Sequence, residues 1–159
     1  MILLSIVVAF AARVLLVMLF LPFSALDKIL NFKQAVGQAA EAIPNRFLAA
    51  IAIFAGLAVE ILMSFAILAG IADRMAALIL AGYCIVTALL WKQFWKQPDF
   101  RLRGASRGRD VFWDFLKNLA LAGGFLALAF GANATGFRNF LAHPLASSHP
   151  YTQTVKGGA

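Results

Sequence analysis

The fold is decided by the stretch from Phe47 to Ile71, which reads FLAAIAIFAGLAVEILMSFAILAGI and holds one charged residue, Glu60. A helix rising about 1.5 Å per residue needs roughly 20 mostly apolar residues to cross a bilayer core about 30 Å thick. The stretch is long enough to do so. We therefore expect a transmembrane helix over residues 47–71.

Three further apolar stretches predict spans over residues 2–26, 75–91 and 111–134. Pro22 is expected to kink the first span or to end its regular part. Only a short connection separates the second and third spans, which predicts a tight antiparallel hairpin. The fold class that follows is all-α, an integral membrane bundle of four transmembrane helices over residues 1–135.

Two segments outside the spans have their own character. Between the first two spans, apolar residues at helical spacing among polar ones predict a short helix lying in the membrane interface. The residues 136–159 are expected to form a flexible C-terminal tail.

Composition agrees with a membrane protein. Of 159 residues, 62% are hydrophobic and 13% charged, whereas soluble domains average about 45–50% and about 25%. This excludes a soluble globule, and the high hydrophobicity excludes intrinsic disorder. The net charge is +7. In a membrane protein an excess of Lys and Arg is typical of the cytoplasmic loops, so it does not indicate a nucleic-acid partner, and none is expected. The single cysteine, Cys84, cannot form a disulfide within the chain and is expected to be a small buried hydrophobe.

The distribution of basic residues predicts the orientation. One side of the membrane receives nine of them, and the other only Arg74, Arg138 and Lys156; the nine are Lys28, Lys33, Arg46, Lys92, Lys96, Arg101, Arg103, Arg107 and Arg109. Because basic loops stay in the cytoplasm, we expect a multi-pass protein of a bacterial-type inner membrane with both termini on the non-cytoplasmic side. The basic loops would contact anionic lipid headgroups, and Trp91, Trp95 and Trp113 would act as interface anchors.

Two charged residues lie near the middle of predicted spans. A charge at mid-helix costs roughly 2.5–3.5 kcal/mol on translocon scales, so it normally turns inward and finds a partner. Arg13 and Glu60 have opposite charge and are expected at similar depth, which predicts an ion pair at the centre of the bundle, either direct or bridged through another polar group. One interpretation is that the pair fixes helix order and register. The other is that it lines a pocket for a polar head group such as a quinone ring, or forms part of a proton path.

The fourth span adds a second polar cluster. Asp114, Lys117 and Asn118 are spaced to share one helical face. They fit either a solvated helix start or the side of a cavity. We expect Lys117 and Asn118 to join Arg13 and Glu60 in an intramembrane pocket, while the residues at its mouth would be Ser24, Lys28 and Asp114.

The sequence lacks the residue patterns of haem binding, metal binding and hydrolase catalysis. His143 and His149 both follow the last span, so a haem held by two histidines within the membrane is not expected. The sequence shows no cluster with metal-ligand spacing and no hydrolase elbow. We therefore expect no catalytic residues, no metal site and no intrinsic cofactor, with a quinone as the ligand that the pocket would take.

Several motifs resemble the DoxX-like family. Over residues 13–32 the chain has an Arg, then Phe20, Ser24, Lys28 and an aromatic residue. Glu60 is similar to a glutamate in the family's second span. Further matching motifs are Gly70 with Arg74, Phe94-Trp95 with Pro98-Asp99, and the run from Phe115 to Gly124, so that the similarity covers residues 10–132. Two positions depart from the pattern: Lys92-Gln93 stands where the family often has a His, and Ala25 where Gly is common.

The resemblance implies a four-helix membrane bundle. It also implies a link to redox biology, because some members belong to quinone- or thiosulfate-connected complexes or to thiol and oxidative-stress assemblies. The first functional hypothesis is an accessory or quinone-facing subunit of a membrane redox assembly. The alternatives are a non-catalytic scaffold in a larger complex or a homo-oligomer, and a small-solute or proton carrier. Whether the chain catalyses a reaction is left open.

Overall fold

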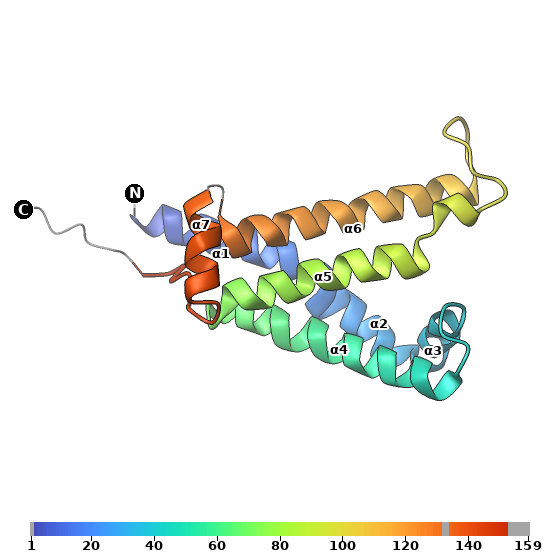
Figure 1. Ribbon diagram of the computed structural model, residues 1–159, viewed down its shortest axis with the longest axis horizontal. Helices are drawn as coiled ribbons and strands as arrows, with labels where there is room; N and C mark the ends of the chain where they lie inside the picture. The colour runs from blue at the N-terminus through green and yellow to red at the C-terminus, as the bar shows by residue number, and fades with distance from the viewer. Residues whose placement is uncertain (1, 132–133, 153–159) are drawn as a thin grey trace, which may run out of the picture.

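The structure is a computed structural model that describes residues 2–131 and 134–152. In chain order its elements are α1 (Ile2–Val17), the π-helix η1 (Leu19–Ser24), α2 (Ala25–Leu30), α3 (Phe32–Ala40), α4 (Arg46–Ala69), α5 (Asp73–Trp91), the short 3-10 helix η2 (Phe94–Lys96), α6 (Arg107–Phe130) and α7 (Ala134–Ala142). The described residues contain no β-strand. Four helical stretches are long and apolar enough to cross a membrane, namely residues 3–30, 46–69, 73–96 and 107–130. The prediction of an all-α membrane bundle with four spans is confirmed (Figure 1).

The first span is longer than predicted because Pro22 does not end it. Proline lacks the backbone N–H of a regular helical hydrogen bond, and a wider π turn accommodates that loss. Pro22 lies inside η1, and the N–H of Ala25 bonds to the carbonyl of Phe20 five residues earlier. The helix then resumes as α2 and reaches Leu30. This continuation decides which side chains of the first span reach the depth of Glu60.

Local signals set the ends of α4. Its first turn is capped by the side chain of Asn45, which accepts from the N–H groups of Phe47 and Leu48. At its other end Gly70 has a φ of 69°, a conformation that favours glycine. The N–H of Ile71 bonds back to Ala66, and this tight ending starts the hairpin into α5.

The core is built where α5 packs against α4 and α6. Buried alanines on α5, at 76, 77, 81 and 88, let the neighbouring helices approach closely. Larger side chains fill the centre, among them Ile67, Leu80 and Phe125, all fully buried. Cys84 is also fully buried and unpaired, which confirms its predicted role as a small core residue.

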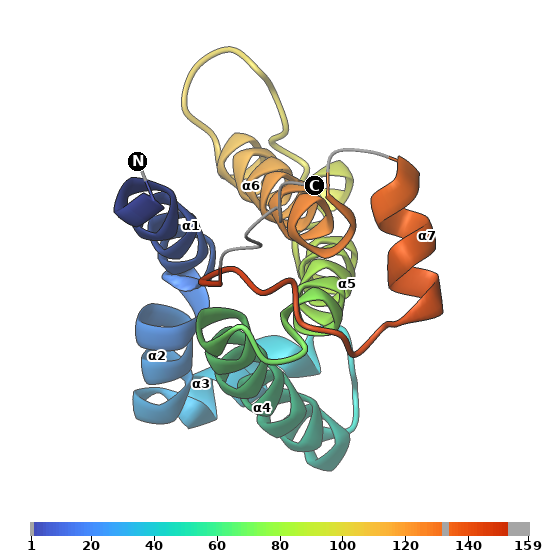
Figure 2. The same cartoon turned by 90° about the vertical axis from the view of Figure 1, so that its left-hand side faces the viewer.

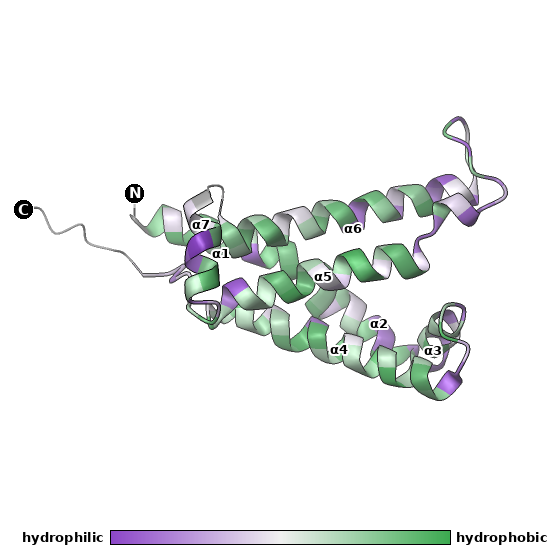
Figure 3. Cartoon of the chain, in the orientation of Figure 1, coloured by the Kyte–Doolittle hydropathy of each residue, from purple (hydrophilic) through white to green (hydrophobic). Residues whose placement is uncertain are grey.

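The two ends of the molecule differ in character. Figure 3 shows apolar colouring along the four long helices and polar colouring in the loop between α5 and α6. This polar end, which we call the basic end, also holds α3, which packs against α4 in the segment predicted to form an interfacial helix. At the opposite end lie the start of α1, the hairpin between α4 and α5, and α7 (Figure 1).

The expected flexible tail over 136–159 needs correction in its described part. Residues 134–142 form α7, and the following segment crosses the end of the bundle near α1, α4 and α5 (Figure 2). Ser147 Oγ donates to the carbonyl of Gly70 at 2.6 Å, and the hydroxyl of Tyr151 donates to that of Leu68 at 2.6 Å. We call residues 143–152 the strap. The strap is anchored by single hydroxyl groups bonded to carbonyls at a helix end. Such anchors leave no pattern in the sequence, and the composition therefore suggested a loose tail. Residues 153–159 lie outside the described part of the chain.

Candidate functional site

The site is centred on Glu60, a carboxylate buried in the middle of α4. Its side chain is 1% exposed. One of its oxygens, Oε1, accepts three hydrogen bonds: from Lys28 Nζ at 2.6 Å, Tyr83 OH at 2.8 Å and Ser24 Oγ at 3.0 Å. A buried charge is tolerated when it is paired and hydrogen-bonded. Lys28 supplies the opposite charge, and its own side chain is 17% exposed.

Four helical elements position this cluster. Ser24 ends η1 and Lys28 lies one turn later in α2, so the two share a face, and Lys28 Nζ also bonds to Ser24 Oγ at 2.6 Å. Tyr83 comes from α5 and passes close to Gly56 of α4. A Cβ atom at Gly56 would lie 3.1 Å from the Tyr83 hydroxyl, so the missing side chain makes room for this approach.

A cavity of about 720 Å³ adjoins the cluster. Ser24, Lys28, Glu60 and Tyr83 line it in the interior of the bundle. Ser24 and Lys28 were expected at the mouth of the pocket, but they lie at its inner end because both bond to the buried Glu60. From there it extends between α3, α5 and α6 toward the basic end, where its walls include Asn31, Gln34, Glu41, Trp91, Lys92, Arg107, Asp114, Lys117 and Asn118. Apolar walls come from side chains such as Leu19, Phe20, Ile53 and Leu121. The cavity is therefore lined by polar and apolar side chains together, with most of its charged groups toward the basic end and the Glu60 cluster at its inner end.

Two buried polar atoms on cavity-lining residues lack a hydrogen-bond partner: Glu60 Oε2 and Trp91 Nε1. Buried polar groups in proteins are nearly always hydrogen-bonded, so each exception calls for an explanation. Glu60 Oε2 can only accept a hydrogen bond as a carboxylate, and the indole N–H of Trp91 can only donate one. A bound molecule with complementary groups would satisfy them.

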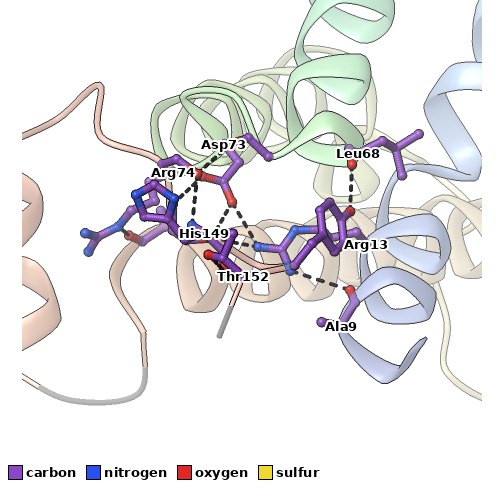
Figure 4. A network of polar contacts seen from close by, with 12 residues as sticks. Ala9, Arg13, Leu68, Asp73, Arg74, His149 and Thr152 are labelled. Atoms are coloured by element: carbon purple, nitrogen blue, oxygen red, sulfur yellow. Dashed lines mark hydrogen bonds and ion pairs between the residues drawn. The ribbon is translucent and has the colours of Figure 1, made fainter. Parts of the chain in front are cut away.

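The expected ion pair between Arg13 and Glu60 is wrong. Arg13 instead pairs with Asp73 at the start of α5, with Nη2 2.9 Å from Oδ2. Figure 4 shows the Arg13 guanidinium beside the Asp73 carboxylate. The strap completes this second network, because the backbone N–H of Ser148 bonds to Asp73 Oδ1 at 2.8 Å and its hydroxyl bonds to both Arg13 and Asp73. The ring of Tyr151 lies 6.0 Å from the guanidinium carbon.

The correction has a geometric cause. Because the first span continues through Pro22 to Leu30, its residues at the depth of Glu60 are Ser24 and Lys28. Arg13 lies toward the other end, level with the hairpin. From Glu60 to the helix end at Gly70 is about ten residues, or about 15 Å at a rise of about 1.5 Å each. Arg13 consequently does not line the cavity.

The remaining predicted pocket residues of α6 do line the cavity. Asp114 pairs with Lys92 at 3.2 Å and with Lys117 at 3.3 Å, and Asn118 donates from Nδ2 to the carbonyl of Asp114 at 2.9 Å. The side chains of Lys117 and Asp114 are 72% and 42% exposed. Exposed ion pairs of this kind contribute little stability. The three residues form part of the polar wall of the cavity toward the basic end.

The three predicted interface anchors differ from one another. Trp95 and Trp113 are about half exposed at the basic end and pack in a cluster of aromatic rings with Phe94, Phe112 and Phe115. Trp91, in contrast, faces the cavity with a buried indole nitrogen. Anchoring in lipid headgroups stays a prediction for all three.

Sequence reasoning missed two members of the buried networks. Tyr83 is a hydroxyl-bearing residue inside the third span, and that mid-span polar group was the signal that could have placed it near Glu60. Asp73 was assigned to a short polar turn, although it is fully buried. In the described part of the chain, no three His, Cys, Asp or Glu residues lie close enough together to hold a metal ion.

Comparison with known proteins gives one match. A family model described as DoxX matches residues 8–93, a range that includes Arg13, Glu60, Tyr83 and all of the cavity-lining positions of the first three spans. Neither a search of curated proteins nor a search of solved structures found a match. The matched segment covers more than half of the 159 residues, and the chain is therefore a member of the DoxX family with four membrane-spanning helices.

Proposed function

We propose that the cavity binds the head group of a neutral, membrane-soluble ring compound of the quinone type, and that the chain serves as an accessory subunit of a membrane redox assembly. The observation that carries the proposal is Glu60, buried at the inner end of the cavity with one oxygen lacking a donor. An ionisable residue inside a membrane protein is costly and is normally retained for a function.

The charges of the cavity favour a neutral ligand. Four basic side chains line it, and they are balanced by four acidic ones: Lys28, Lys92, Arg107 and Lys117 against Asp27, Glu41, Glu60 and Asp114. The whole chain carries a net charge of +7, so this balance is a local property. An inorganic anion or a lipid phosphate would find no surplus of positive charge here.

The size of the cavity also suits a ring compound. Pockets for small ligands occupy about 300–1,000 Å³, and this one measures about 720 Å³. The proposal has a ligand with an apolar tail enter from the bilayer, because the cavity lies among membrane-spanning helices. The polar groups at its inner end would orient the ring.

The accessory role follows from the residues available for electron transfer. The chain has a single cysteine, so it has no internal dithiol pair. The described residues contain no cluster of metal-ligating side chains. The proposal therefore assigns electron transfer to a partner protein, while this chain holds the ring. We place the assembly in a bacterial-type inner membrane, with the basic end in the cytoplasm as the distribution of Lys and Arg favours.

Binding to the purified protein tests the proposal. A short-chain benzoquinol and its benzoquinone would be titrated into the protein in phosphatidylcholine nanodiscs, with affinity measured by calorimetry. Wild type is expected to bind at least one of them. Glu60→Gln should weaken the binding of the preferred form about tenfold, the effect of losing one hydrogen bond to a charged group. Asp110→Asn is the matched control, because it removes an exposed carboxylate that does not line the cavity.

Failure to bind either compound would contradict the head-group proposal. A stoichiometric membrane partner recovered in mild detergent from native membranes, without any ring binding, would instead support a non-catalytic scaffold. Flux of protons or solutes into proteoliposomes would support a carrier.

A further inference from the structure

The two oxygens of the Glu60 carboxylate have different surroundings. Oε1 receives three donors, from Ser24, Lys28 and Tyr83. Oε2 is buried and receives none. Because Glu60 lines the cavity, a ligand group that reaches this carboxylate would find an acceptor with unused capacity at Oε2.

The donors around this carboxylate are directed mainly at Oε1. Lys28 Nζ bonds to both Ser24 Oγ and Glu60 Oε1, and the single hydroxyl protons of Ser24 and Tyr83 are directed at Oε1. The unpartnered donor, Trp91 Nε1, lies eight residues beyond Tyr83 on α5, about 12 Å away at a rise of about 1.5 Å per residue. A group placed beside Oε2 thus meets the unpartnered acceptor, whereas the remaining N–H of Lys28 lies with Nζ on the Oε1 side of the carboxylate.

This asymmetry distinguishes the two redox forms of a quinone-type ring. The carbonyl oxygens of the oxidised ring only accept hydrogen bonds, so beside a carboxylate oxygen they would leave two acceptors facing each other. The hydroxyl groups of the reduced ring donate. We propose that the cavity selects the reduced, hydroxyl-bearing form of the ring, and that Glu60 Oε2 is the specificity-determining acceptor.

This inference rests on the proposed function. A comparison of three related ligands distinguishes failure of the inference from failure of the proposed function. The ligands are a short-chain benzoquinol, the matching benzoquinone, and the dimethyl ether of the same quinol, all titrated anaerobically into wild-type protein. The ether keeps the ring, tail and reduced state but has no hydroxyl proton. Nanodiscs of phosphatidylcholine are used because that headgroup has no O–H donor to compete for Glu60.

The expected result is that the quinol binds about tenfold or more tightly than both other ligands, as one hydrogen bond to a charged acceptor predicts. Equal affinity for the quinol and its dimethyl ether would overturn the selectivity while leaving ring binding intact. Binding of none of the three would overturn the proposed function and the selectivity together.

Two variants assign the selectivity to its residue. Glu60→Gln replaces a pure acceptor with an amide that can also donate, so the preference for quinol over quinone should fall toward one. Tyr83→Phe leaves the carboxylate in place and should keep the preference. The titrations of wild-type protein test the selectivity by themselves, so the proposal can be overturned even if neither variant folds. An unchanged preference in folded Glu60→Gln would assign the selectivity elsewhere and contradict it.

Discussion

Arg13 and Glu60 belong to different networks, although both are charged residues within predicted spans. Arg13 pairs with Asp73 near one end of the bundle, and Glu60 pairs with Lys28 deeper inside. Both acidic partners are 1% exposed or less. Each network satisfies a buried charge with its opposite and with hydroxyl groups. Only the Glu60 network adjoins the cavity, and this difference gives the two networks different expected phenotypes.

Arg13→Ala should destabilise the protein without changing ligand binding. The change leaves Asp73 buried without its cation, and breaking a buried pair costs about 3–5 kcal/mol. The free energy of unfolding in mild detergent with added denaturant measures the loss. Arg138→Ala, at an exposed position of α7, is the matched control and should change stability by less than about 0.5 kcal/mol. Weaker binding of the quinol by folded Arg13→Ala would contradict the separation of the two networks.

Gly56→Ala should disturb the Glu60 cluster from outside it. The added Cβ would lie 3.1 Å from the Tyr83 hydroxyl, so Tyr83 must move away from Glu60. We expect a loss of about 1 kcal/mol in stability and weaker quinol binding, measured by thermal unfolding and calorimetry. Gly82→Ala serves as the control, since its Cβ would meet nothing within 4 Å. Identical behaviour of the two variants would show that the close approach of Tyr83 is not required.

The strap is the element that sequence composition described least well. It holds prolines, histidines and small polar residues, which are typical of a loose terminus. Its anchors are Ser147, Ser148 and Tyr151, each of which bonds to a group at the end of α4 or α5. Because hydroxyl groups carry no periodic pattern, such anchoring leaves no signal in the sequence.

Ser148→Ala should lower stability by about 1–2 kcal/mol, because it removes a hydrogen bond to a buried charged group. The backbone N–H of residue 148 and Arg13 remain as donors to Asp73, so the bundle should still fold. Thermal unfolding in detergent measures the shift. Leu145→Ala, at a position of the strap that is 70% exposed, should be close to neutral. A larger effect from Leu145→Ala than from Ser148→Ala would mean that the strap is held by apolar contacts.

The long helices, in contrast, follow from hydrophobic length alone. Spans two, three and four were predicted within a few residues of their observed bounds, because each is a long apolar run. The first span was predicted about as closely, over 2–26 against 3–30, although the helix continues through Pro22 further than expected. The offset of this span along the bundle was misjudged, because Ser24 and Lys28, and not Arg13, lie at the depth of Glu60. The fold was thus readable from the sequence, whereas the pairing of charges depended on how far one helix is offset along another, which hydrophobic length does not determine.

At the scale of the whole molecule, the charge distribution predicts a topology. The loop between α5 and α6 carries several basic residues, whereas the strap lies at the opposite end (Figure 1). We expect the loop in the cytoplasm. In a Cys84→Ala background, Arg103→Cys should react with a membrane-impermeant maleimide only in inverted vesicles. Ala146→Cys should react only from the outside of intact spheroplasts. The reverse pattern would invert the topology and place the basic end outside.

The central claim is that the cavity beside Glu60 holds the ligand ring and that the Arg13 network does not. A cryo-electron microscopy map of the protein in nanodiscs with the short-chain benzoquinol tests it most directly, with an antibody fragment added to give the particle sufficient mass. The account predicts ring density between α4 and α5, with a hydroxyl oxygen within hydrogen-bond distance of Glu60 Oε2. The account would be contradicted by ring density beside Arg13 and Asp73. It would also be contradicted by ring density on the outer surface of the bundle and none in the cavity.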